Sequence, residues 1–202
     1  MNFNELIEEE KAHQRENNIT TLRNEINKSW VEEKLNNFLE RYKYSNLGTV
    51  EELKNLILAD KLVASFFIKD PSKQNITEKA VARLLKVDKM PASGSNSVCF
   101  NESGELVHST SNRNSKSADF YFNNIYWTQK YTTSSGGHQD NQRHDVVKFL
   151  EYGSKNYKVG ALLDGDYWVN HINKLKEDFK NNDNVIILSC EDILNGKYKI
   201  EQ

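Results

Sequence analysis

The first third of the chain has the apolar spacing of amphipathic helices. Across residues 20–44, apolar side chains recur close to the 3.6-residue helical period, at Leu22, Ile26, Trp30, Leu35 and Leu39. Asn46-Leu47-Gly48 interrupts this pattern. Thr49 and Glu52 have capping-box spacing and predict a second helix that continues to about Phe66. Residues 1–69 are therefore predicted to form a helical N-terminal region.

The pattern changes after Asp70-Pro71, which predicts the start of a helix that ends at about Leu85. Short apolar segments bounded by turn residues then predict strands. We expect strands at residues 97–101, 105–109, 118–122, 125–131, 159–163 and 185–189, and helices at 139–152 and 167–179. This order predicts an α/β domain over 70–202, with a mixed central sheet flanked by helices.

Composition and charge narrow the class of protein. The formal net charge of −2 is not that of a simple electrostatic nucleic-acid binder. The charge is uneven, however: residues 1–60 carry 8 basic and 12 acidic side chains, a net of −4, whereas residues 61–158 carry 14 and 9, a net of +5. Phosphate binding is therefore expected in the middle of the chain. Cys99 and Cys190 lack metal-ligand spacing and are expected to be buried thiols.

The sequence gives no sign of a membrane protein or of a nucleotide-binding enzyme. The longest apolar runs, 62–68 and 185–190, are too short to cross a bilayer. The acidic N-terminus has no signal-peptide pattern, so a cytoplasmic location is expected. The chain has neither of the glycine-rich motifs that bind nucleotide phosphates, so no nucleotide cofactor is expected.

Asp119 and Lys130 are the charged residues with the strongest indication of chemistry. Each lies within an aromatic-rich predicted strand, where burying a charge is costly unless it is paired or bound to a metal. Asn123-Asn124 predicts a tight hairpin between the strands, which would place both side chains in one pocket. A carboxylate that holds Mg²⁺ beside a lysine that positions water would suit phosphodiester hydrolysis. An ordinary cross-strand salt bridge is the alternative.

The surrounding residues resemble the PD-(D/E)xK nuclease superfamily. Ala118-Asp119 stands for the first part of its motif and Thr128-Gln129-Lys130 for the second. A Gly/Ser loop, a polar helix and an apolar strand ending in Asp164-Gly165 follow, as in several type II restriction endonucleases. The resemblance implies a restriction-endonuclease-like core that hydrolyses double-stranded DNA with Mg²⁺ at a short specific sequence.

One position departs from the family pattern. Thr128 stands where the resemblance leads us to expect Asp or Glu. Thr128 itself would be a weak ligand through water, or a bulge would bring Gln129 into the acid's place. Alternatively, Glu78 from the preceding helix would supply the missing carboxylate, completing the metal shell with Asp119. If none of these groups replaces the missing acid, the protein is expected to bind DNA without cutting it.

Two segments have the side chains that contact DNA. The first follows Lys130 and is dense in groups that bind bases or phosphates: Ser134, Ser135, His138, Gln139, Asn141, Gln142 and Arg143. The second precedes Asp119 and combines amides with cations: Asn112, Arg113, Asn114 and Lys116. A polar surface loop is the alternative for each segment.

The sequence-based hypothesis is thus a type II restriction endonuclease that acts as a homodimer on a palindromic site. The helical N-terminal region would serve as a dimerisation or DNA-clasp arm. A repair or recombination nuclease of the same fold, recognising DNA shape, is the first alternative. A non-catalytic DNA-binding protein is the second, and it is favoured by the Thr128 departure.

Overall fold

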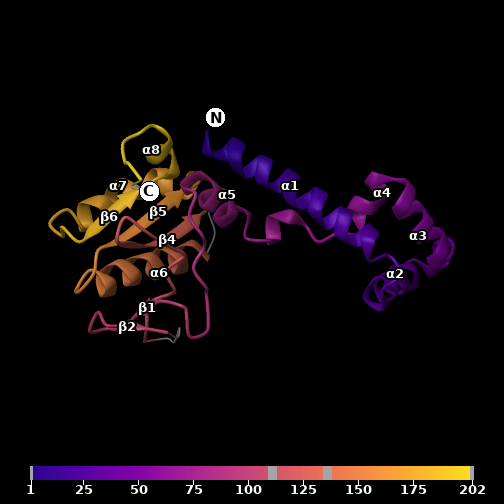
Figure 1. The fold of residues 1–202 in the computed structure, drawn as a ribbon, viewed down its shortest axis with the longest axis horizontal. Coiled ribbons are helices and arrows are strands. Elements are labelled where there is room, and N and C mark those ends of the chain that lie inside the picture. The colour runs from indigo at the N-terminus through magenta and orange to yellow at the C-terminus, as the bar shows by residue number, and fades with distance from the viewer. Residues whose placement is uncertain (1, 109–112, 134–137, 201–202) are drawn as a thin grey trace. The chain divides into compact units, whose positions relative to one another are not determined.

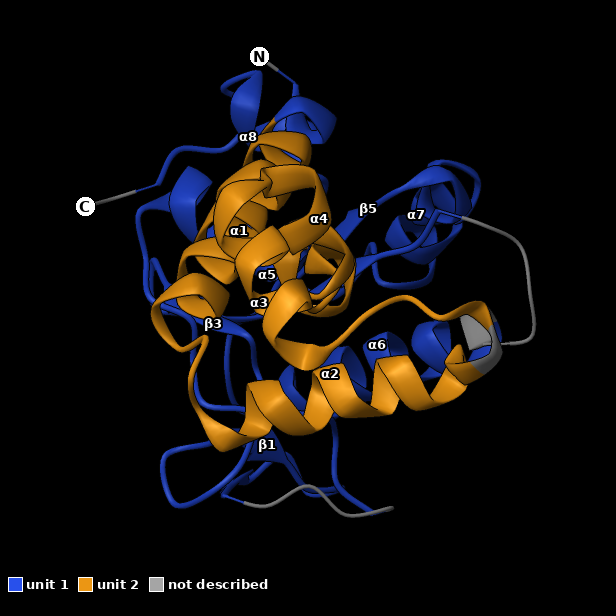
Figure 2. Cartoon of the chain, turned by 90° about the vertical axis from the view of Figure 1, so that its right-hand side faces the viewer, with its two compact units in different colours: residues 1–5, 77–202 blue, residues 6–76 orange. Residues whose placement is uncertain are grey.

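The computed structural model describes residues 2–108, 113–133 and 138–200. The chain forms two compact units, which Figure 2 shows in blue and orange. One unit comprises residues 1–5 and 77–202, and the other comprises residues 6–76. The boundary predicted at residue 69 therefore lies inside the helical unit. No helix among the described residues is long and apolar enough to cross a membrane.

The unit of residues 6–76 is helical. Its elements are α1 (Phe3–Asn24, which begins in the other unit), α2 (Ser29–Arg41), η1 (Lys43–Ser45), α3 (Val50–Ala59), α4 (Lys61–Phe66) and η2 (Pro71–Lys73). Its buried core consists of Ile19, Leu22, Ile26, Val31, Leu35, Leu53, Ile57, Ala64 and Phe67. The capping box predicted at Thr49 and Glu52 is present and begins α3.

Two helical predictions in this part of the chain were wrong in detail. The helix expected over 20–44 is divided between Asn24 and Ser29, and Trp30 is 41% exposed instead of buried. The helix expected to reach Phe66 is divided at Asp60, whose carboxylate caps α4. Periodicity did not detect these breaks because the apolar spacing continues across each of them.

The helix predicted from Asp70 is also shorter than expected. Pro71–Lys73 forms a single 3-10 turn, and the positive φ of 56° at Asn75 separates this turn from α5 (Ile76–Leu85). Gln74 therefore lies outside the helix that carries Glu78. The left-handed conformation of Asn75 breaks the helix that the sequence spacing predicted from Asp70.

The other unit contains the mixed sheet that the strand and helix order predicted. The four-stranded sheet has the order β3 (Phe120–Phe122), β4 (Ile125–Tyr131), β5 (Val159–Asp164) and β6 (Val185–Leu188). Figure 1 labels β4, β5 and β6 of this sheet. β3 and β4 are antiparallel, whereas β4, β5 and β6 are parallel. A separate antiparallel pair precedes them, β1 (Cys99–Phe100) with β2 (Leu106–Val107).

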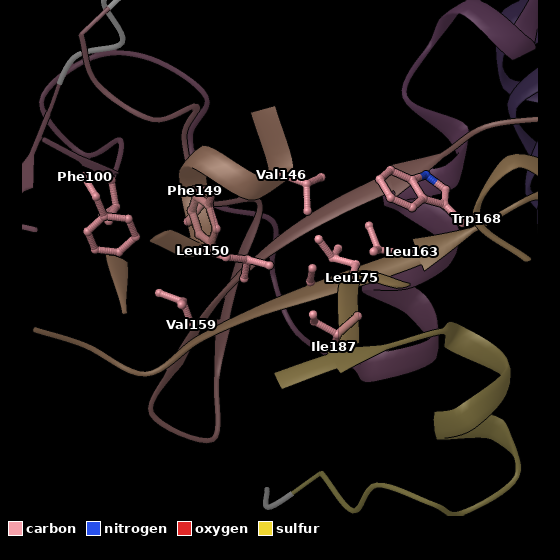
Figure 3. Close-up of a cluster of buried hydrophobic side chains, with 12 residues drawn as sticks. Phe100, Val146, Phe149, Leu150, Val159, Leu163, Trp168, Leu175 and Ile187 are labelled. Atoms are coloured by element: carbon pink, nitrogen blue, oxygen red, sulfur yellow. The ribbon is translucent and has the colours of Figure 1, made fainter. Parts of the chain in front are cut away.

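Helices provide the crossovers between the parallel strands. α6 (His138–Gly153) joins β4 to β5, and α7 (Asp166–Asp178) joins β5 to β6, followed by the short α8 (Cys190–Leu194). Side chains of β1, α6, β5, α7 and β6 contribute to one hydrophobic cluster, which Figure 3 shows with Phe100 at one end and Trp168 at the other. Cys99 and Cys190 are buried free thiols, as predicted.

The parallel register places the ends of three strands at one edge of the sheet. Lys130 pairs with Leu163 and Tyr131 with Asp164, so the carboxyl ends of β4 and β5 are level. In open α/β sheets, ligands bind outside this edge. Lys130 and the polar residues that follow β5 are therefore positioned where a substrate can approach the sheet.

Candidate active site

Asp119 and Lys130 are positioned by the β3–β4 hairpin. Asn123 and Asn124 both have positive φ, 53° and 59°, as a two-residue hairpin turn with the twist of the strands requires. The register pairs Phe120 with Trp127. The Asp119 N–H donates to the Trp127 carbonyl at 2.8 Å, which extends the pairing by one residue. The turn therefore determines that Asp119 meets the end of β4.

Two hydrogen-bond donors and one ammonium group converge on one carboxylate oxygen, Oδ2 of Asp119. The backbone N–H of Gln129 donates to it at 2.7 Å and the Thr128 hydroxyl at 3.3 Å. The Lys130 ammonium lies 3.8 Å from the same atom and also donates to the Gln129 carbonyl at 3.0 Å. Among the described residues, Oδ1 of Asp119 accepts no hydrogen bond. One oxygen is thus held firmly while the other remains available as a ligand.

The electrostatic surroundings of Asp119 include two further charged residues. Burial raises the pKa of the Asp119 carboxyl above its ordinary value, although the Lys130 charge and the Gln129 N–H act to lower it. The Glu78 carboxylate also raises this pKa, and the Lys89 ammonium lowers it. Glu78 and Lys89 form an ion pair with each other. The fold therefore gathers two carboxylates and two lysines within one electrostatic site.

Glu78 was expected at this site, but Lys89 was not. Glu78 lies in the first turn of α5, and its negative charge raises the pKa of the Asp119 carboxyl. Lys89 lies in the segment after α5 and belongs to none of the motifs in the sequence. The only local signal was its position beside Met90-Pro91, where the chain turns from helix to the strand region. A backbone hydrogen bond from Met90 to the Asp119 carbonyl, at 2.8 Å, brings the segment to the site.

Thr128 and Gln129 lie on opposite faces of β4. Thr128 is on the face of Asp119 and holds its carboxylate. The register from Tyr126 to Tyr131 against β5 is continuous, so the bulge that would turn the Gln129 side chain toward Asp119 is absent. The Gln129 side chain is buried, and its Nε2 has no hydrogen-bond partner among the described residues. Only the backbone of Gln129 contributes to the site.

Two carboxylates at this site are available as ligands for a divalent metal ion. The described residues contain no cluster of three or more His, Cys, Asp or Glu side chains that could hold a metal ion. Mg²⁺ commonly keeps several waters and binds through one or two carboxylates together with substrate phosphates. Asp119, with its available Oδ1, and Glu78 are the two carboxylates that would hold it.

The predicted DNA-contacting residues after Lys130 are only partly placed. Ser134 and Ser135 lie outside the described residues, as do the side chains of His138 and Gln139 in α6. Asn141 is exposed in the first turns of the helix. The side chains of Gln142 and Arg143 have structural partners: Gln142 accepts a hydrogen bond from Thr132 at 2.6 Å, and Arg143 contacts Asp178 at 3.5 Å.

The segment before Asp119 is likewise incompletely described. Asn112 lies outside the described residues. Arg113 and Lys116 are exposed and Asn114 is partly buried. The buried Ser115 hydroxyl accepts a hydrogen bond from the Phe100 N–H at 2.8 Å, which attaches the segment to β1. Arg113, Asn114 and Lys116 are thus carried on a segment anchored directly before Asp119.

Asp164 and Asp166 lie where the sequence predicted the end of one strand and the start of the following helix. Asp164 is the last residue of β5 and is buried, and its Oδ1 accepts the Cys190 N–H at 2.9 Å. Asp166 is the first residue of α7, and Gly165 holds the N-cap position with a φ of 96°. Burial of a carboxylate depends on the packing of α8, which local sequence does not show.

Because Asp164 is buried, we expect the free energy of unfolding to depend measurably on pH. Burial raises the pKa of Asp164 to about 6, although the hydrogen bonds from Cys190 act to lower it. The folded state then holds the proton more tightly than the unfolded state, so this residue's contribution to stability decreases as pH rises from about 4 to about 6. We expect a loss of about 2 kcal/mol between about pH 4.5 and about pH 7, and none of it in Asp164→Asn.

Urea unfolding at about pH 4.5 and about pH 7 checks this expectation, because the difference between the wild type and Asp164→Asn isolates one group from the other carboxylates. An equal pH dependence in the two proteins would contradict a raised pKa at Asp164. Asn retains the oxygen that accepts the Cys190 N–H, so the substitution removes the charge and little else.

Comparison with known proteins identified no relative of this chain. No protein-family description, no curated protein and no solved structure matches the chain. The conclusions about the candidate site therefore depend on its residues and their geometry.

Proposed function

We propose that this protein is a Mg²⁺-dependent endonuclease that cuts double-stranded DNA at a short specific sequence, as type II restriction endonucleases do. The observation that carries the proposal is the buried Asp119 carboxylate, held by Lys130 and the Gln129 N–H on one oxygen and influenced by the Glu78 charge. The mixed sheet supports it, because the hairpin and the following parallel strand have the order that the sequence resemblance implies.

Each residue of the site has a defined task in this proposal. Bound Mg²⁺ would supply charge stabilisation at the phosphoryl oxygen and a more acidic water. Asp119 and Glu78 hold the ion, and the Thr128 hydroxyl and the Gln129 N–H fix the orientation of the Asp119 carboxylate. Lys130 positions the attacking water and neutralises charge that develops on the phosphate. A hydrogen bond from the Lys130 ammonium to the Gln129 carbonyl helps to fix the orientation of this side chain.

The partners proposed for the enzyme follow from its substrate. A palindromic duplex site is most simply read by two identical subunits related by a two-fold axis, so we propose a homodimer. The residues of the segments before Asp119 and after Lys130 would contact bases and phosphates. The enzyme would act on DNA in the cytoplasm.

Incubation of the purified protein with supercoiled plasmid and Mg²⁺ tests the proposed activity. We expect discrete fragments, and none when the metal is chelated. Sequencing of the fragment ends would give the recognition site and the cut position. A smear of products from every plasmid would favour a nuclease that recognises DNA shape, and intact plasmid would contradict a nuclease of either kind.

A non-catalytic DNA-binding protein is the second candidate, and a specific observation favours it. Thr128 stands where the family resemblance leads us to expect an acid. Such a protein would retain the fold and bind duplex DNA without cutting it. Sequence-specific binding in a gel-shift experiment, with plasmid left intact in Mg²⁺, would select this function over the first.

A further inference from the structure

Lys89 belongs to the same electrostatic site as Lys130, although it lies far from it in the sequence. The Met90 N–H donates to the Asp119 carbonyl at 2.8 Å, which fixes the segment carrying Lys89 beside the start of β3. The Lys89 ammonium pairs with Glu78, and its charge lowers the pKa of Asp119. The side chains of Lys89 and Glu78 are 31% and 21% exposed, so solvent and ligands can reach the pair.

The charges at this site cancel in the absence of ligands. The carboxylates of Asp119 and Glu78 each have a lysine partner, Lys130 and Lys89 respectively. A divalent cation held by the two carboxylates would replace both lysines as the counter-charge. The site would then carry a net charge of +2, which favours an anion, and both ammonium groups would be available to it. A DNA phosphodiester is an anion of the required kind.

We propose that Lys89 is a second phosphate-binding lysine of this site, held by Glu78 until DNA and metal arrive. This inference rests on the proposed nuclease function. Lys130 acts at the reacting phosphate, and Lys89 binds the backbone beside it. A lysine that contacts a phosphate contributes to affinity whatever the base sequence, through release of counterions from DNA.

The chain offers a matched control for this lysine. Lys86 lies in the same segment, is exposed, and forms no hydrogen bond or ion pair with the described residues. Lys86→Met therefore removes the same charge from the same segment without touching Glu78. Lys89→Arg retains the positive charge of Lys89, although with a different shape.

DNA binding measured by fluorescence anisotropy tests the proposal. The titrations use Ca²⁺, which binds oxygen ligands with a geometry looser than that of Mg²⁺, over a range of salt concentrations. We expect Lys89→Met to bind duplex DNA about tenfold more weakly, with a salt dependence reduced by about one phosphate contact. Lys86→Met should match the wild type, and Lys89→Arg should retain most of the affinity. Circular dichroism confirms that each variant is folded.

Two results would overturn the proposal, and they are distinguishable. If the wild type cuts plasmid but Lys89→Met binds DNA with the affinity and salt dependence of Lys86→Met, Lys89 does not contact phosphate while the nuclease function stands. If the wild type binds no duplex DNA even at low salt, the proposed function and the role of Lys89 fail together.

Discussion

DNA cleavage is expected to fall by about 1000-fold or more in Asp119→Asn, because the substitution removes the charge that would hold the metal and leaves the polar shape in place. Lys130→Met should lower cleavage by about 100-fold to 1000-fold, the usual effect of removing one group that stabilises developing negative charge. The readout is the rate of plasmid cleavage at saturating protein. Both changes act at one 3.8 Å contact, so the double variant should be little worse than Asp119→Asn.

Matched controls come from the opposite edge of the sheet. Lys158 precedes β5 and Asp183 precedes β6, and both are exposed. Lys158→Met and Asp183→Asn therefore make the same changes of charge far from the carboxyl ends of the strands. We expect both to cut DNA at the wild-type rate. If these controls lose as much cleavage as the site variants, the losses reflect net charge and Asp119 and Lys130 are not the reacting groups.

Gly160→Ala is expected to destabilise the fold by about 3 kcal/mol, at the upper end of the usual cost of overpacking. A Cβ at this position would lie 2.3 Å from the ring of Trp127, far inside van der Waals contact. The Trp127 ring cannot retreat easily, because it is fully buried and stacks on Phe122 with ring centroids 4.8 Å apart. The measurement is the free energy of unfolding in urea, followed by circular dichroism.

A double-mutant cycle shows whether the clash with Trp127 is the cause. In a Trp127→Leu background, Gly160→Ala should cost less than about 1 kcal/mol, because the ring it meets is gone. Gly94→Ala is the control for adding a methyl group in open space, since no atom of the described residues other than its chain neighbours lies within 4 Å of the added Cβ. Its φ of 88° alone should cost about 1 kcal/mol. An equal cost of Gly160→Ala in both backgrounds would contradict this explanation.

The fold was predictable wherever neighbouring residues determine it. Alternating and continuous apolar segments located β4, β5 and β6, and their order with α6 and α7 predicted the mixed sheet. The N-terminal helices were located but divided incorrectly, because an apolar spacing that continues across a break gives no sign of it. Trp30 shows the same limitation: its position in the periodic pattern predicted burial, yet it is 41% exposed and donates to Glu25.

The residues of the candidate site also fall into two groups, those that the local sequence brings together and those that only tertiary packing adds. Sequence alone determined that Asp119 and Lys130 meet, because a two-residue Asn-Asn turn and the alternation of side chains fix the pairing of adjacent strands. The sequence left Glu78 as one of several alternatives, and only the tertiary structure decided that Lys89 joins the site, that the Gln129 side chain faces away and that Asp164 is buried. These features depend on how α5, α8 and the sheet pack together, and packing of distant segments leaves no periodic trace in the local sequence.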